Sequence, residues 1–190
     1  MQRPAPLNEE IKLDPEKMIV SKTDTDGYIT YVNEYFEEIC GYSKDELLGS
    51  SHNIIRHPDM PRIIFKLMWQ NIKEQKDFKV LIKNLAKDGR YYWVLTKFET
   101  LIDPITQKII SHTAYRKAPT RYQIGVIEPL YEKMIEIEKY GGVAASEKFL
   151  DEFLRENGMS YEEFIKSTAT HEKKGFMDKT KGFLKGIIKK

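Results

Sequence analysis

The stretch from Phe78 to Lys117 constrains the fold more than any other, because it contains three consecutive strand patterns. Phe78, Val80 and Ile82 occupy alternate positions, the period of a strand with one buried face. Asp88-Gly89 is a strong hairpin signal after the first strand. The strands that follow, and the turn between them, are Tyr91–Ile102, Asp103–Lys108 and Ile109–Lys117. Because strands joined by such short turns pair antiparallel, the sequence predicts an antiparallel sheet.

Two shorter strands and several short helices precede this region. Met18–Ser21 and Tyr28–Val32 are rich in apolar, aromatic and β-branched residues and form a predicted hairpin. Asn33 is expected to cap a short helix, and Ser43-Lys-Asp-Glu46 has the pattern of a capping box for a second. Pro61–Gln75 has the apolar spacing of a third, longer helix. The expected fold class is α+β, with a five-stranded antiparallel sheet and short helices on one face.

The sequence becomes helical in character after Pro119. We expect a helix from Pro129 to Tyr140, a break at Gly141-Gly142, a second helix over Ala144–Glu156 and a third beginning at Ser160. Residues 172–190 contain seven lysines and two acidic residues. The predicted organisation is a flexible arm over residues 1–16, the α+β domain over 17–119, a helical extension over 120–171 and a basic amphipathic tail over 172–190.

A polar segment lies directly before the longest helix of the α+β domain. His52, Arg56 and His57 stand beside Pro58 and Pro61, which prevent a continuous helix and stiffen the chain. Polar groups held on a rigid loop at the edge of an apolar helix are typical of a ligand-binding wall. The alternative is that the prolines only shape a turn and that the cations are solvated.

Asn84 is the most informative single residue of the strand pattern. It continues the alternation of Phe78, Val80 and Ile82, so its carboxamide is expected to point into the apolar interior. A buried amide without a partner costs roughly 1–3 kcal/mol. We therefore expect either a structural hydrogen bond or a ligand at this position.

Composition and motifs narrow the function classes. A net charge of +2 gives no indication of nucleic-acid binding, and no apolar run is long enough to span a membrane. The N-terminus lacks the apolar centre of a secretory signal, and the lone Cys40 fits a reducing compartment, so we expect a cytoplasmic protein. The histidines and Cys40 match no zinc spacing, whereas haem held by one histidine needs no motif. No nucleophile, phosphate-binding or paired-acid motif is present, so we expect no enzyme activity and no catalytic residues.

Several of these residues together resemble the PAS domain of the Aer-type aerotaxis receptors, over roughly residues 18–134. The general PAS pattern is loose, but Arg-His-Pro-Asp-Met-Pro with a downstream Trp and Asn is much narrower. The resembling positions are Asn33, Gly41-Tyr42-Ser43, Glu46-Leu47, His52-Asn53, Arg56-His57-Pro58-Asp59-Met60-Pro61, Met68-Trp69, Lys83-Asn84, Lys87, Gly89, Tyr92-Trp93-Val94 and Glu128-Pro-Leu-Tyr131.

The resemblance implies a sensor that binds FAD without a covalent bond and reports redox state in energy taxis. It implies cofactor-binding roles for six positions and a signalling or binding role for Asp59. The six are Asn33, His52, Arg56, His57, Trp69 and Asn84. The alternative is a PAS module that binds haem, or no cofactor, and acts as a protein-docking domain in signal transduction.

In layout the chain is more similar to the separate PAS subunit of bipartite, Campylobacter-type energy-taxis systems than to the one-piece receptors. That resemblance implies a membrane-bound HAMP-containing signalling receptor as partner. It is also compatible with a homodimer through the PAS sheet. Because its lysines segregate from its apolar residues, the tail over 172–190 could contact the inner face of the membrane peripherally.

Overall fold

The computed structural model describes residues 3–76 and 78–169. The chain divides into two compact units. The first contains the sheet and comprises Met1–Pro58 and Met68–Pro119. The second comprises Asp59–Leu67 together with Thr120–Lys190, so residues 59–67 group with the C-terminal helices rather than with the sheet. The basic tail predicted over residues 172–190 lies outside the described residues.

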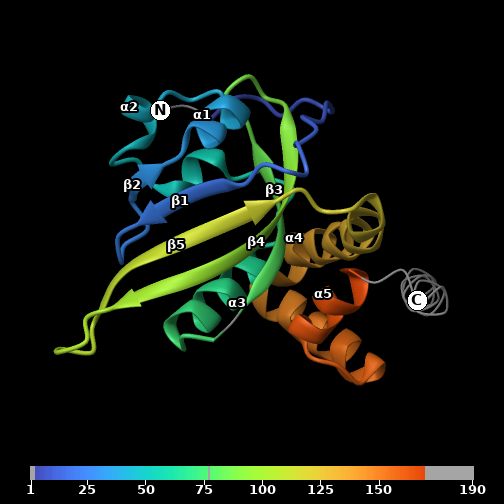
Figure 1. The fold of residues 1–190 in the computed structure, drawn as a ribbon. Coiled ribbons are helices and arrows are strands. Elements are labelled where there is room, and N and C mark those ends of the chain that lie inside the picture. The colour runs from blue at the N-terminus through green and yellow to red at the C-terminus, as the bar shows by residue number, and fades with distance from the viewer. Residues whose placement is uncertain (1–2, 77, 170–190) are drawn as a thin grey trace. The chain divides into compact units, whose positions relative to one another are not determined.

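The first unit is built on a five-stranded antiparallel sheet with the strand order β2-β1-β5-β4-β3 (Figure 1). The strands are β1 (Ile19–Thr23), β2 (Ile29–Val32), β3 (Lys79–Leu85), β4 (Tyr91–Ile102) and β5 (Ile109–Lys117). The alternation read from the sequence therefore predicts the fold class correctly. The long β4–β5 pair lies at the centre of the sheet, and its loop extends furthest from the rest of the unit (Figure 1).

Short helices pack on one face of this sheet, and side-chain caps fix where they begin. The helices are α1 (Glu34–Cys40), α2 (Lys44–Leu47), the 3-10 helix η1 (His52–Ile55) and α3 (Arg62–Lys73). Asn33 caps α1 and Ser43 opens α2 with a complete capping box, as predicted. Helix α1 packs on β1 and α2 on β2.

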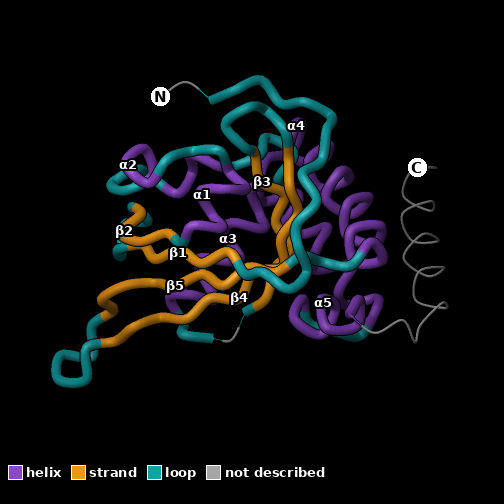
Figure 2. Tube along the Cα trace, turned by 45° about the horizontal axis from the view of Figure 1, so that its top comes forward, coloured by secondary structure: helices purple, strands orange, loops and turns teal. Residues whose placement is uncertain are grey.

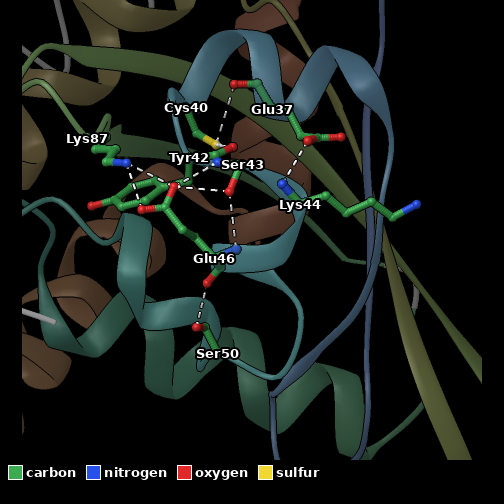
Figure 3. A network of polar contacts seen from close by, with 8 residues as sticks. All are labelled: Glu37, Cys40, Tyr42, Ser43, Lys44, Glu46, Ser50 and Lys87. Carbon is green, nitrogen blue, oxygen red and sulfur yellow. Dashed lines mark hydrogen bonds and ion pairs between the residues drawn. The ribbon is translucent and has the colours of Figure 1, made fainter.

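A network of polar contacts closes the corner between α1 and α2 (Figure 3). Lys87, in the β3–β4 turn, places its Nζ 2.6 Å from Glu46 Oε1, and its backbone N–H donates to the Cys40 carbonyl at 2.8 Å. Glu46 also accepts a hydrogen bond from the Ser43 backbone N–H at 2.9 Å. Several residues of the PAS resemblance, among them Gly41, Ser43, Glu46 and Lys87, thus hold the fold together at this corner.

The N-terminal arm is attached to the sheet by its backbone. The Leu7 N–H donates to the Gly89 carbonyl at 2.7 Å, and the Tyr91 N–H donates to the Glu9 carbonyl at 2.9 Å. Gly89 has φ = +92°, and a Cβ there would collide with the Ala5 carbonyl oxygen. Figure 2 draws the arm as a loop, and these bonds attach it to the β3–β4 hairpin.

The second unit is helical and consists mainly of α4 (Arg121–Asn157) and α5 (Tyr161–Ala169). Helix α4 begins at a capping box of Thr120 and Gln123, eight residues before Pro129, so the prediction that Pro129 starts a helix is wrong. The predicted break is present as a kink at Gly142, where φ is 68° and ψ is −170°. Helix α5 packs against α4, and Phe153 of α4 meets Phe164 of α5 edge to face with ring centroids 5.2 Å apart.

Within this unit, a carboxylate of α4 caps the beginning of α3. Glu138 accepts hydrogen bonds from the backbone N–H groups of Arg62 and Ile63, both at 2.9 Å, and from Arg62 Nε at 3.2 Å. A carboxylate there satisfies N–H groups that lack intrahelical partners and interacts favourably with the helix dipole. Among the described residues, no helix is long and apolar enough to cross a membrane.

Candidate functional site

Strand pairing places a row of polar side chains on one buried face of the sheet. Residues directly opposite each other in an antiparallel pair project from the same side. The register pairs Asn84 with Tyr92, Thr96 with Arg116 and Ser21 with Ala114. The polar residues of this face include Ser21, Asn84, Tyr92, Thr96, His112 and Arg116, all of which are buried.

Three of these side chains have buried polar atoms without a hydrogen-bond partner among the described residues. They are Asn84 Nδ2, the Tyr92 hydroxyl and Thr96 Oγ1. Burial raises the pKa of Tyr92 well above its usual value; the Asn84 carboxamide opposes that shift, although no hydrogen bond of good geometry joins the two. Because buried polar groups are normally paired, three unpaired atoms on one face make it a candidate site for a polar ligand.

Arg116 lies on the same face, and its hydrogen-bond partners among the described residues are neutral groups. Its Nη1 donates to Ser21 Oγ at 2.9 Å, and its Nη2 contacts His52 Nε2 at 2.8 Å. The guanidinium lies 5.7 Å from the centre of the Phe36 ring of α1. Burial lowers the pKa of Arg116 to about 10, which leaves it charged at neutral pH.

His52 is held in its neutral form by this arrangement. Its Nε2 accepts from Arg116 and also lies 3.2 Å from Ser21 Oγ, while its ring stacks on Phe36 with centroids 6.0 Å apart. Burial, reinforced by the positive charge of Arg116, lowers the pKa of His52 to about 3. The predicted site residue His52 therefore belongs to the interior cluster, as an acceptor for Arg116.

The stiff polar loop after His52 meets the sheet at Asn84. Arg56 is half-buried and forms an isolated antiparallel bridge with Asn84 through its backbone. His57 is buried, and its ring meets Tyr91 edge-on with centroids 6.1 Å apart. Asp59 is exposed and belongs to the second unit. Three predicted site residues, Arg56, His57 and Asn84, are therefore brought together at the β3 edge of the interior.

Trp69 lies at the opposite end of this face, near the β1–β2 turn. Its ring meets His112 edge-on with centroids 5.9 Å apart. It also packs against Gly27, where a Cβ would approach Trp69 Cη2 to 3.6 Å. The indole remains half-buried, so part of its surface is open to a ligand.

Asn33 is positioned differently from the other predicted site residues. Its Oδ1 accepts from the backbone N–H groups of Val20 at 3.0 Å and Phe36 at 3.2 Å, and its Nδ2 donates to the Met18 carbonyl at 2.8 Å. These bonds join the start of α1 to β1. The structure therefore assigns Asn33 a part in positioning α1, the helix that carries Phe36.

The sequence analysis missed Arg116, Tyr92, Thr96 and Ser21 as interior polar residues. A signal was present, because Arg116 has the same parity as His112 and Ala114 in a strand predicted with the correct bounds. An arginine is usually assigned to the solvent face, and only the register with Thr96 shows that it points inward.

The low pKa of His52 predicts loss of stability in acid. In the folded protein His52 binds a proton only near pH 3, whereas its usual pKa is 6.5, so the unfolded chain binds more protons between these values. The free energy of unfolding should fall as the pH is lowered from 6.5 toward 3. Urea unfolding at several pH values should show a shallower pH dependence for His52→Gln than for the unsubstituted protein. Identical pH dependences would contradict a neutral, half-buried His52.

Comparison with known proteins agrees with this architecture. Residues 29–110 match the family described as the PAS fold. Together with the sheet order and the short helices on one face, the match shows that this part of the chain is a PAS domain.

Among curated proteins, the chain is similar to the aerotaxis receptor of Escherichia coli, with 33% identity over 131 residues, 69% of this chain and 26% of the receptor. It is also 35% identical over 75 residues to the bacterioopsin transcriptional activator of Halobacterium salinarum, covering 40% of this chain and 11% of that protein. Among solved structures, the light state of the photoreceptor Aureochrome1 LOV aligns with a TM-score of 0.49 and 24% identity, over 64% of this chain and 90% of that one. The chain thus spans about a quarter or less of these two curated relatives.

Proposed function

We propose that the interior of the PAS unit binds a flavin, as FAD without a covalent bond, and that the protein is a redox sensor of energy taxis. The observation that carries this proposal is the set of three unpaired buried atoms on one face, Asn84 Nδ2, the Tyr92 hydroxyl and Thr96 Oγ1. A flavin offers a ring edge with two carbonyl acceptors beside an N–H donor, which such groups complement. The similarity to an aerotaxis receptor supports the same assignment.

Four of the six predicted cofactor-binding residues have a direct role in this proposal. The Asn84 carboxamide would pair with the polar ring edge, since a carboxamide both donates and accepts. Trp69 would cover the apolar side of the ring with the open part of its indole. Arg56 and His57 would wall the site at β3, where the Arg56 backbone bridges Asn84. A bound flavin would supply reversible uptake of electrons, and these residues would bind and orient it and exclude water.

The proposed output is a change in conformation rather than a chemical product, so we propose a reporter and no enzyme. A cytoplasmic PAS unit of this kind would bind a membrane-bound HAMP-containing signalling receptor differently in its two redox states, since a ligand shifts an equilibrium only through its differential affinity. The row of Leu130, Met134 and Ile137 on α4 offers such a partner little surface, because Leu130 and Met134 are fully buried and Ile137 is half-buried. The partner would instead bind the exposed surface of the sheet.

An absorption spectrum of the purified protein from a flavin-replete host tests the proposal. We expect a yellow protein with two broad bands in the near-ultraviolet and blue, and release of FAD on denaturation. A sharp, intense band would indicate haem, although His52 Nε2 is already engaged by Arg116. A colourless, folded protein that also fails to bind added FAD would favour a docking module and end the flavin proposal.

A further inference from the structure

Arg116 is a buried cation, and the contacts of its side chain among the described residues are with neutral groups. Its side chain is on the interior face of β5 and the residue is 3% exposed. Its polar contacts are the Ser21 hydroxyl, His52 Nε2 and, at 3.5 Å, the Ala114 carbonyl. Among the described residues, none of its contacts is a carboxylate.

The neighbours that could change charge are also neutral at physiological pH. His52 accepts from Arg116, and its pKa is lowered to about 3 by burial and by the arginine itself. Tyr92, on the adjacent strand, has a pKa raised well above 10 by burial. Burial also lowers the pKa of His112, two residues before Ala114 on the same strand. Among the described residues, Arg116 is therefore a buried positive charge that these neighbouring side chains do not neutralise.

Such an arrangement is costly without a ligand. Moving a charge out of water into a protein interior costs several kcal/mol unless an opposite charge or good hydrogen bonds compensate. Ser21 and His52 supply acceptors and fix the guanidinium, but they supply no negative charge. Phe36 also contacts the guanidinium and limits access of water on the α1 side. A ligand that becomes negatively charged in this interior would be stabilised by the positive charge of Arg116, which is already positioned there.

We propose that Arg116, held by Ser21 and His52, selects the negatively charged form of the reduced flavin. The inference rests on the proposed flavin function and deepens it. Reduction of the ring by two electrons can be accompanied by two protons, which leaves it neutral, or by one proton, which leaves it with a charge of −1. Arg116 favours the form that takes up only one proton, because the interaction of its charge with that form is strong in a low-dielectric interior. It thereby raises the affinity for reduced flavin relative to oxidised flavin.

The proposal is tested with oxidised FAD and with FAD reduced by dithionite under anaerobic conditions. Arg116→Gln keeps hydrogen-bond donors but removes the charge, and it should weaken binding of reduced FAD at least tenfold more than binding of oxidised FAD. Arg116→Lys should recover part of that ratio, because it restores the charge. Thr96→Val, on the strand position paired with Arg116, is the matched control and should weaken both forms alike. Equal losses for both redox forms in Arg116→Gln would overturn the proposal.

A second measurement follows the midpoint potential instead of the affinity. Between pH 6 and 8, the midpoint potential of the bound flavin should change with pH by the slope expected for uptake of one proton with two electrons. In Arg116→Gln this slope should double. His52 and Tyr92 do not titrate in this range, and His57 and His112 are present in both proteins, so the difference between the two slopes reports the ligand. A slope of two protons for two electrons in the unsubstituted protein would overturn the role of Arg116, whatever the variants do. A protein that binds no flavin would instead refute the proposed function, so the two failures are distinct.

Discussion

Trp69→Ala should reduce the affinity for FAD by about 100-fold, equivalent to about 2.7 kcal/mol. The half-buried indole packs on Gly27 and meets His112 edge-on, which leaves one part of the ring to cover a ligand in the interior. Removal of a buried aromatic side chain typically costs about 3–5 kcal/mol, and the partial exposure of Trp69 reduces that figure. Fluorescence titration of the apo-protein with FAD measures the effect directly.

Two further variants separate loss of the ligand contact from general destabilisation. Trp69→Phe keeps an aromatic face and should lose about tenfold or less in affinity, since most of the apolar contact remains. Tyr140→Ala changes a side chain that is 91% exposed in the second unit, and it should leave affinity unchanged. Retention of full affinity by Trp69→Ala, in a protein with unchanged thermal stability, would show that the ring does not lie beside Trp69.

The sheet could be predicted because the sequence signals that specify it act over a few residues. Alternation along Phe78–Ile82 and the Asp88-Gly89 turn specify the strands and their antiparallel pairing without any knowledge of distant contacts. The same alternation predicts that Asn84 points inward, and the structure confirms that it is buried with its Nδ2 unpaired. The caps at Asn33 and Ser43 were predictable for the same reason, since each acts within three residues.

The features that could not be predicted depend on partners far along the chain. The N-terminal arm is ordered by hydrogen bonds to Gly89 and Tyr91, some eighty residues away. Pro129 is accommodated within α4, whose start is decided upstream by the capping box of Thr120 and Gln123. Composition alone cannot show such contacts, because they appear only when the register of the fold is known.

Arg116 shows why the polar residues of the interior could be only partly predicted from the sequence. The sequence analysis placed the polar wall of the site on the His52–His57 loop, because this loop combines prolines with cationic side chains. The structure shows that the charge at the centre of the interior comes from β5 instead and that His52 serves it as an acceptor. The resembling positions also divide into two sets. Ser43, Glu46 and Lys87 hold the α1–α2 corner, whereas His52, Asn84 and Tyr92 line the interior.

The helical unit should be sensitive to truncation of its core. Phe153 and Phe164 are fully buried, and Tyr161 beside Phe164 shares a buried hydroxyl pair with Tyr131, with oxygens 2.8 Å apart. Phe153→Ala leaves a cavity between α4 and α5 and should lower the free energy of unfolding by about 3–5 kcal/mol. Phe153→Leu keeps most of the volume and should cost no more than about 1.5 kcal/mol.

This substitution also tests our proposal that the C-terminal helices form an extension distinct from the PAS unit. Helical circular dichroism and flavin absorbance, followed in the same thermal scan of the full chain, report the two units separately. If the units unfold independently, Phe153→Ala lowers the transition of the helices and leaves the flavin transition in place, because the interior residues Asn84, Thr96 and Arg116 all belong to the first unit. An equal shift of both transitions would mean that the two units unfold as one cooperative body. In that case the helical extension is part of the stability of the sensor itself, and a change at the flavin can reach it without a separate hinge.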